Sequence, residues 1–406
     1  MSPADQEIAL PGGISAGSVS RPASAVEVAD LLRAASDLDQ GVVPFGGGLS
    51  LAAGNVIEPV DIGLDLTGLR GVYSYHPADL TLSVGAGTTF AEIAGTLREH
   101  GQELPIDVPF PDRATIGGLI ATGFAGPRRL SAGSLKDLII GCEFARGDGL
   151  LAKAGGMVVK NVSGFEIPRL LHGSWGSLAV LTSVNLKVVP GQRSEATLLV
   201  RVASVATAVD MASRLLAAQP AVSACTVTRR DDDVTMAVRY MGRHGAVLAM
   251  VKEGGASAAA YGTIARTLEE PESRTFWQTQ VEEWASESID VVISAGTRPR
   301  DLSRFVSIVE DRFGGPDHTF SLVASPGTGA IRFRLDRTAI AAEELRAWWT
   351  EADFPERTVG HIEFAPTDWK RGTSVWGLGQ AQDPLMRAIK TQFDPHGILN
   401  PGRLFV

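Results

Sequence analysis

Three consecutive glycines follow an apolar run in the stretch VVPFGGGLSLAAGN, residues 42–55. Because glycine lacks a Cβ atom, backbone N–H groups in such a run can converge on an anion, and the chain can approach a pyrophosphate closely. The stretch has neither the GxxxxGK[ST] pattern of P-loop proteins nor the GxGxxG pattern of a dinucleotide-binding turn. Gly46, Gly47 and Gly48 therefore indicate either a phosphate-binding loop of another type or a flexible turn.

Two further glycine-rich stretches follow in order. ATIGGLIATGFAGPRR (114–129) has a glycine pair and then small residues against which a flat ring system could lie, and KNVSGFEIPRLLHGSWGSLAVLT (160–182) adds a third stretch. Each of them alone could be a tight packing turn. All three together, in this order, fit packing turns poorly.

These stretches and the terminal FDPHGILNPGRLF resemble, in order, the FAD-binding stretches of the vanillyl-alcohol-oxidase-type flavoproteins, also called p-cresol-methylhydroxylase-type (PCMH-type). The pairing of GPRR with KNVSGFEIPRL and the chain length are most similar to the FAD-binding subunits of bacterial glycolate oxidases (glycolate dehydrogenases). The resemblance implies an α+β fold. In it, a two-subdomain PCMH-type FAD-binding domain (1–190) is followed by a mixed α/β cap (191–370), and a C-terminal segment (371–406) returns to the first domain.

The resemblance also implies which residues contact FAD. Backbone amides and a hydroxyl of the first stretch would hold the pyrophosphate, the second would line the path from pyrophosphate to ring, and the third would lie near the adenine. Carried over by position, the cofactor residues are Gly46, Gly47, Gly48, Leu49, Ser50, Pro109, Thr115, Ile116, Gly117, Gly118, Ala121, Thr122, Gly126, Arg128, Gly133, Gly173, Gly176, Val180 and Arg403. No cysteine lies in these motifs, so we expect a noncovalent flavin.

Arg403 would place a cation near the pyrimidine edge of the flavin, where reduction puts negative charge that a buried guanidinium favours. Its alternative role is a structural salt bridge at the C-terminal end of the sequence.

The cap departs from the metal-dependent 2-hydroxy-acid dehydrogenases of the same superfamily, which carry a histidine pair in a run like H-A-G-D-G-N-x-H. This chain has VASPGTGAIRFRL (323–335) at that place, so we expect no metal site. Oxidation of a 2-hydroxy acid needs a base for the hydroxyl proton and a positively charged clamp for the carboxylate. Arg332 and Arg334 are the clamp candidates, while His361 and Glu363 lie two residues apart, on one face of any strand. Arg332 and His361 are therefore the candidate catalytic residues, although a lone histidine is more often structural.

Two functions remain open. In the first, the chain is the flavin-carrying subunit of a multisubunit glycolate oxidase, in which a paralogous catalytic flavoprotein subunit oxidises the 2-hydroxy acid and an iron–sulfur subunit passes on the electrons. In the second, it is a self-sufficient flavoenzyme that oxidises a small alcohol or hydroxy acid itself. The missing histidine pair and the lack of cluster cysteines favour the first.

The amino-acid composition limits the binding partners, the metal sites and the cellular location that the chain can have. The net charge of −9, with no basic run, argues against a nucleic-acid partner. Cys142 and Cys225 are the only cysteines and lie far apart, so the chain's thiols cannot build a zinc or iron–sulfur site. The sequence shows no signal peptide or membrane-spanning stretch, and we expect a cytoplasmic protein; association with a membrane through its partner subunits stays open.

Local patterns predict the elements that position these residues. Thr89 and Glu92 have capping-box spacing after a strand, and 146–149 (RGDG) suits a hairpin turn. In 205–216, apolar residues repeat with helical period and predict a helix that lies on a sheet, between strands of the cap. The pattern in 252–300 is weaker, and there we expect helices.

Overall fold

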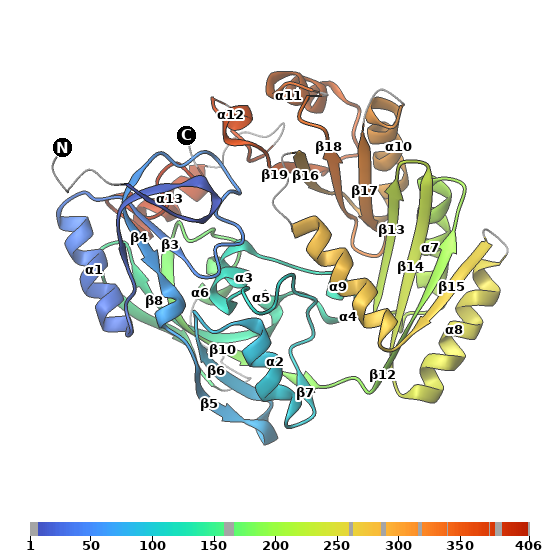
Figure 1. The fold of residues 1–406 in the computed structure, drawn as a ribbon, viewed down its shortest axis with the longest axis horizontal. Coiled ribbons are helices and arrows are strands. Elements are labelled where there is room, and N and C mark those ends of the chain that lie inside the picture. Colours follow the sequence, from blue (N-terminus) through green and yellow to red (C-terminus); the bar gives the residue numbers. More distant parts are fainter. Residues whose placement is uncertain are drawn as a thin grey trace. The chain divides into compact units, whose positions relative to one another are not determined.

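The computed structural model describes residues 7–157, 166–259, 263–285, 290–315, 319–338, 340–372, 374–377 and 384–404. The chain divides into two units (Figure 1), each described here by itself. The first comprises residues 1–125, 134–191 and 382–406, and the second comprises 126–133 and 192–381.

Two sheets dominate the first unit, a four-stranded mixed sheet and a five-stranded antiparallel sheet. In one, β3 and β2 run parallel to β4, and β1 pairs antiparallel with β2; the order is β1 (Ile8–Ala9), β2 (Ser15–Ser20), β4 (Val60–Asp65), β3 (Val42–Phe45). The other is antiparallel, in the order β5 (Val72–His76), β6 (Thr81–Gly85), β10 (Ala179–Lys187), β8 (Ile139–Arg146), β9 (Leu151–Gly155). A short pair joins β7 (Gln102–Glu103) to β11 (Val189–Pro190).

The first unit also contains six helices of four or more residues and three 3₁₀ turns among the described residues. They are α1 (Ala25–Asp37), α2 (Phe90–Arg98), α3 (Ile116–Thr122), α5 (Leu135–Leu138), α6 (Ile167–Leu171), α13 (Pro384–Phe393) and the 3₁₀ turns η1 (Pro11–Gly13), η2 (Leu66–Gly68) and η3 (Pro77–Asp79). One core lies under α1, and a second gathers side chains of α2, α3 and α5 on the antiparallel sheet. The predicted hairpin at 146–149 is confirmed, since it joins β8 to β9.

The second unit is built on an eight-stranded antiparallel sheet (Figure 1). Its order is β15 (Thr263–Glu269), β12 (Ser194–Arg201), β14 (Asp233–Gly242), β13 (Ala224–Arg230), β17 (Phe320–Ser325), β18 (Ala330–Leu335), β16 (Val291–Gly296), β19 (Val359–Phe364). Its helices are α4 (Arg129–Ala132), α7 (Val205–Ala218), α8 (His244–Ala258), α9 (Glu272–Ala285), α10 (Leu302–Phe313), α11 (Ala342–Glu351), α12 (Thr367–Lys370) and the turn η4 (Pro299–Asp301).

The two faces of this sheet differ. Helices α7, α8, α10 and α11 bury a large apolar core on one face. On the other face, Trp277 of α9 packs against Ala224 of β13 and Ala237 of β14. The predicted helix at 205–216 is confirmed as α7, which buries Val205, Ala208 and Leu215 among others. In 252–300 the expected helices are present as the end of α8 and as α9, but β15 and β16 were not foreseen.

Two segments pack elsewhere than the sequence-based boundaries would put them. Residues 126–133, assigned to the first domain from sequence, belong to the second unit, because Leu130 packs against its core and the Ser131 hydroxyl donates to the Ser223 carbonyl at 2.9 Å. Residues 371–372 and 374–377, assigned to the returning C-terminal segment from sequence, also belong to the second unit, where Val375 is fully buried and its carbonyl accepts a hydrogen bond from Ile362 N–H.

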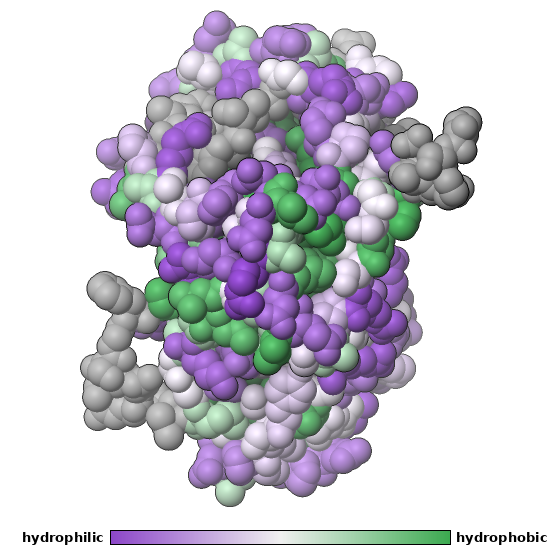
Figure 2. Space-filling view, turned by 90° about the vertical axis from the view of Figure 1, so that its left-hand side faces the viewer, coloured by the Kyte–Doolittle hydropathy of each residue, from purple (hydrophilic) through white to green (hydrophobic). Residues whose placement is uncertain are grey.

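Hydrophilic side chains cover much of the face drawn in Figure 2, with apolar residues gathered across its middle. Within the described part of the chain, no helix combines the length and the apolar character needed to cross a bilayer.

Candidate functional site

The glycine run forms a loop that leaves the end of β3 and packs against the segment before α3. A Cβ atom on Gly46 would lie 2.1 Å from Thr115 Oγ1, and one on Gly47 would lie 1.9 Å from the Arg113 carbonyl oxygen. Both distances are far below van der Waals contact, so a side chain at Gly47 would displace the Arg113 backbone, and one at Gly46 would displace the Thr115 side chain. These two glycines are therefore required by contact between two chain segments, whatever the loop binds.

The backbone amides of the next residues are available to a ligand. Gly48 has φ +71°, a left-handed conformation that turns the chain. Among the described residues, the N–H groups of Gly47, Gly48, Leu49 and Ser50 find no hydrogen-bond acceptor. Successive free amides at a glycine turn form a concave anion site. The Arg113 guanidinium, which donates to the Gly47 carbonyl at 3.4 Å, adds a positive charge beside this loop.

The amides at the start of α3, by contrast, are already used. Ile116 N–H donates to the Thr88 carbonyl at 2.9 Å and Gly117 N–H to the Ala86 carbonyl at 2.8 Å. Gly118 N–H donates to the hydroxyl of Thr115, which caps the helix. The helix start therefore supports the glycine loop and cannot itself supply those amides to an anion.

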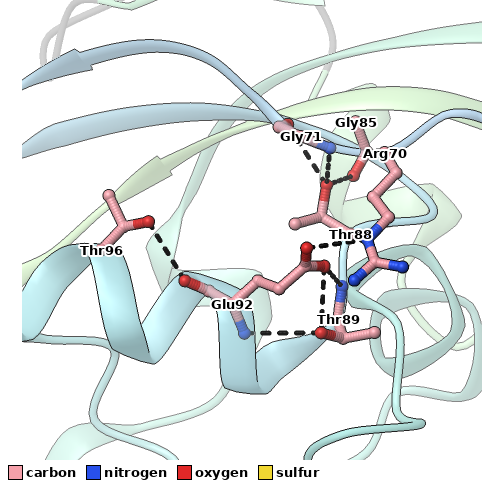
Figure 3. A network of polar contacts seen from close by, with 7 residues as sticks. All are labelled: Arg70, Gly71, Gly85, Thr88, Thr89, Glu92 and Thr96. Atoms are coloured by element: carbon pink, nitrogen blue, oxygen red, sulfur yellow. Dashed lines mark hydrogen bonds and ion pairs between the residues drawn. The ribbon is translucent and has the colours of Figure 1, made fainter.

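A polar network fixes the backbone that receives α3 (Figure 3). Thr89 and Glu92 form the predicted capping box: the Thr89 N–H donates to the Glu92 carboxylate at 3.0 Å, and the Glu92 N–H to the Thr89 hydroxyl at 3.4 Å. The Thr88 hydroxyl donates to the Gly85 carbonyl at 2.7 Å, and Arg70 pairs with Glu92 at 2.7 Å. Burial alone would raise the pKa of Glu92, but the hydrogen bonds from Thr89 and Arg70 outweigh it and hold this pKa below its usual value.

The end of α3 meets the loop that follows α6. Gly173 N–H donates to the Ile120 carbonyl at 2.9 Å and Trp175 N–H to the Ala121 carbonyl at 2.7 Å. Gly173 and Gly176 both have positive φ, and the amide of Asn400 donates to the Trp175 carbonyl at 2.9 Å. Parts of the second and third glycine-rich stretches therefore lie in backbone contact.

The C-terminal stretch forms an additional parallel bridge on β3. Val42 N–H donates to the Ile398 carbonyl and Asn400 N–H to the Val42 carbonyl, at 2.8 and 2.9 Å. Asp394, which the sequence did not single out, accepts hydrogen bonds from Ile398 and Leu399 N–H at 3.1 and 2.8 Å. Lys390 pairs with Asp394 and also donates to the Ser177 carbonyl at 2.7 Å.

Arg403 lies at the end of this stretch, with an exposure of 2%. Its Nη1 donates to the carbonyl of Leu51 at 3.1 Å and to that of Ala53, and its Nε donates to Asn400 Oδ1 at 3.3 Å. These partners belong to the loop that follows the glycine run and to the C-terminal stretch itself.

The remaining residues predicted to contact the cofactor belong to several different elements. Val180 is buried in the core under α1, and Gly126, Arg128 and Gly133 belong to the second unit. Pro109 is buried in the loop before α3, and the Thr122 hydroxyl donates to the Gly118 carbonyl within the helix at 2.9 Å. The part of the third stretch at 160–165 lies outside the described residues.

In the second unit, Arg332 and His361 lie on two strands that flank β16 and are paired with the same residue of β16. Ser294 on β16 pairs with Arg332 on one side and with His361 on the other. Arg332 binds Glu363 at two points, Nε to Oε2 and Nη2 to Oε1, both at 2.9 Å. Arg334 donates to the Glu283 carbonyl at 2.9 Å and lies over the Trp284 ring. Both predicted clamp candidates are therefore engaged within the unit.

His361 stacks on Trp376, with ring centroids 5.2 Å apart. Removal of the ring from water lowers the pKa of His361; nearby Glu363 raises it in part, and Arg332 lowers it further. The imidazole is therefore neutral at pH 7.

Two segments of the chain match known protein families. Residues 17–165 match the FAD binding domain family, and residues 378–404 match the C-terminal domain of FAD linked oxidases. These matches show an FAD-binding domain in residues 17–165 and a segment of the FAD linked oxidase C-terminal domain in residues 378–404. This chain is 40% identical to the glycolate oxidase subunit GlcE of Escherichia coli over 136 residues, so the match spans 33% of this chain and less than half of GlcE, 39%.

A second relative matches over more of its length. The glycolate oxidase subunit GlcD of Bacillus subtilis is 24% identical, with 95% of this chain and 88% of GlcD covered. Among solved structures, a glucooligosaccharide oxidase of Acremonium strictum superimposes with a TM-score of 0.69 over 98% of this chain and 92% of that one, at 13% identity. At this low sequence identity, the similarity to the glucooligosaccharide oxidase shows a shared fold and nothing about function.

The residues of the first unit fit FAD. A pyrophosphate requires several donors, and the unbonded amides of Gly47–Ser50 together with the nearby Arg113 guanidinium are donors of that kind. Arg113 was missed from sequence, although it is the cation that immediately precedes ATIGG.

Proposed function

We propose that this chain is the FAD-binding subunit of a multisubunit glycolate oxidase (glycolate dehydrogenase). In this role it takes part in the oxidation of a 2-hydroxy acid, glycolate, to the 2-oxo acid glyoxylate, and its electrons leave through partner subunits. Similarity to two glycolate oxidase subunits supports the substrate class.

The proposed cofactor site uses the residues inferred from sequence in different ways. The amides of Gly47, Gly48, Leu49 and Ser50 hold the pyrophosphate, while Gly46 and Thr115 keep the loop in place. Ile116, Gly117, Gly118, Ala121 and Thr122 shape the wall next to it, and Gly173 and Gly176 form the adenine side. When bound, FAD supplies a two-electron acceptor for substrate oxidation.

The two-point pairing of Arg332 with Glu363 is the observation that favours a subunit over a self-sufficient enzyme. A carboxylate clamp needs an arginine whose donors face the substrate, and these donors face Glu363 instead. Arg334 is held by α9, and the β17–β18 turn, residues 326–329, has no histidine. A paralogous catalytic flavoprotein subunit would then bind and oxidise the hydroxy acid.

Transfer of electrons from the flavin to an acceptor would also require other protein chains. Cys142 and Cys225 are buried in different units, and burial raises the pKa of each thiol to about 12. An iron–sulfur cluster is held by thiolates, so its ligands would come from a separate iron–sulfur subunit.

One observation favours the second candidate, an enzyme that oxidises its own small alcohol or hydroxy acid. Neutral His361 can accept a proton, and both His361 and Arg332 pair with Ser294 of the strand between them. In that case Arg332 and His361 would be the catalytic pair.

Anaerobic stopped-flow reduction of the purified, flavin-loaded chain separates the two. A panel of glycolate, D-lactate and other 2-hydroxy acids should leave the flavin largely oxidised in the isolated chain, and co-expression with the partner subunits should make it reducible. General-base assistance contributes about 10²- to 10⁴-fold, so a chain without a placed base should react slower by at least that factor. Rapid, saturable bleaching of the isolated chain would contradict the subunit role, and loss of that bleaching in His361→Gln would support the second candidate.

A further inference from the structure

The stretch from Ile398 to Arg403 contacts the proposed pyrophosphate loop from two directions. Its backbone pairs with Val42 in β3, the strand that leads into the glycine run. Its Arg403 carbonyl accepts from Asn55 N–H at 3.2 Å, at the far end of the same loop. The C-terminal stretch therefore contacts the start of the strand that leads into the loop and also the far end of the loop.

Between these points, the Arg403 side chain binds the loop directly. The loop joins β3 to β4 without regular secondary structure, and one of its internal backbone bonds runs from Ala53 N–H to the Ser50 carbonyl at 3.2 Å. The guanidinium donates to the carbonyls of Leu51 and Ala53, directly after Ser50. Carbonyls turned toward Arg403 fix the orientation of the peptide planes in this part of the loop.

Arg403 is a permanent donor in this position. Burial lowers the pKa of Arg403 to about 10, which leaves the guanidinium charged at neutral pH. Hydrogen bonds from a charged donor in a buried place are stronger than neutral ones. The same guanidinium donates to Asn400 Oδ1, and Asn400 holds the Trp175 carbonyl, so the loop and the turn at Trp175–Gly176 are tied to one side chain.

We propose that Arg403 is a positioning residue that pre-organises the loop of residues 47–55 for the FAD pyrophosphate, and that it does not act on the flavin ring. The inference rests on the proposed placement of the pyrophosphate at Gly47–Ser50. A loop already held in its binding conformation loses less conformational freedom on binding, so its ligand is released more slowly. The role is independent of the substrate and of the partner subunits.

The test compares Arg403→Met, Arg403→Lys and the control Arg33→Met. Arg33 lies on α1 with 56% of its side chain exposed and pairs with Asp30, so its variant removes an arginine without touching the loop. Three quantities are measured: the rate of FAD release, followed by recovery of free-flavin fluorescence; amide hydrogen exchange at residues 47–55 in the flavin-free protein; and the two-electron potential of the bound flavin.

Loss of the charged donor in Arg403→Met should speed FAD release by about tenfold or more. Loop exchange in the flavin-free protein should also become faster, and the potential should stay at its wild-type value. A lysine ammonium can still donate to both carbonyls, so Arg403→Lys should release FAD within about threefold of wild type. Arg33→Met should match wild type in all three measurements.

Two results would overturn the proposal. A lowered potential in Arg403→Met with unchanged loop exchange would place the guanidinium's action at the flavin ring. Unchanged loop exchange and unchanged FAD release would leave Arg403 as a packing residue only. If Arg403→Met does not fold, the test relies on Arg403→Lys. A shifted flavin potential in Arg403→Lys overturns the proposal. Slow FAD release with an unchanged flavin potential supports it. Failure of the glycolate oxidase role would alter none of these measurements, whereas a wild-type chain that does not bind FAD would remove the basis of both.

Discussion

The carbonyl oxygen of Arg113 lies 1.9 Å from the point where a Cβ atom of Gly47 would stand. The glycine run after β3 and the segment before α3 are therefore in direct backbone contact. Two stretches that the sequence presents as separate cofactor contacts form one structural unit.

Gly47→Ala should destabilise the protein even when no flavin is bound. The new methyl group must displace the Arg113 backbone, and overpacking of this kind costs about 1–3 kcal/mol. Chemical denaturation of the flavin-free protein measures the change. Gly95→Ala is the matched control, since nothing lies within 4 Å of a Cβ atom there and Gly95 is inside helix α2. It should be neutral or stabilising by up to about 1 kcal/mol. Equal stability of Gly47→Ala and wild type would refute the contact.

Arg113→Gln should weaken FAD binding without affecting the fold. The guanidinium is exposed and lies beside the proposed pyrophosphate loop, so its charge contributes modestly, by a factor of about 2–5 in Kd. Titration of the flavin-free protein with FAD at low and high salt should give a smaller salt dependence in the variant, because one screened charge is missing. A Kd that equals the wild-type value at low salt would place the phosphates elsewhere. Arg33→Gln serves as the control.

Thr89→Ala should cost about 1 kcal/mol of folding free energy at pH 7, since it removes the cap of α2. The pKa of Glu92 is lowered in the folded state, so its contribution is present above the unfolded-state pKa and is lost as the pH falls through the folded value. The deficit of the variant should therefore shrink under acidic conditions. Denaturation at pH 7 and pH 4 checks both statements. Thr96→Ala is the control, because the Thr96 hydroxyl donates to a carbonyl within the same helix and caps nothing (Figure 3).

His361→Gln should flatten the acid side of the stability profile. Because the pKa of His361 is lower in the folded than in the unfolded protein, the unfolded chain binds the proton first, and wild-type stability falls as the pH drops below about 6.5. The variant lacks this term, so the difference in unfolding free energy between pH 7.5 and pH 5.5 should be smaller than in wild type. An equal difference would show that the ring is not shielded by Trp376.

Local sequence patterns predicted local structure well. The Thr89–Glu92 box, the 146–149 hairpin and α7 each depend on residues within one or two turns of each other, and all three are present. Strand β15 was missed because its pairing is with β12, more than sixty residues earlier, and nothing in its own spacing reveals that partner.

The roles of the charged residues depended on partners distant in sequence. Arg332 meets Glu363 across the intervening strand β16, a neighbourhood set by the strand order and not by spacing along the chain. Arg403 was singled out for the charge that reduction places on a flavin, and nothing in its local sequence shows that its guanidinium donates to Asn400, Leu51 and Ala53. Leu130 shows the same limit for domain boundaries, since chain continuity does not say which core a side chain joins.

The bridge between Val42 and Leu399 has a consequence for biosynthesis. During synthesis the first unit's parallel sheet emerges early, but the residue that ties its binding loop, Arg403, follows Leu51 by 352 residues. At translation rates of about 5–20 residues per second, roughly 20 to 70 s separate the two. A nascent chain would therefore carry an open edge at β3 and a loose loop until residues 399–403 have been synthesised and have paired with Val42 and Leu51.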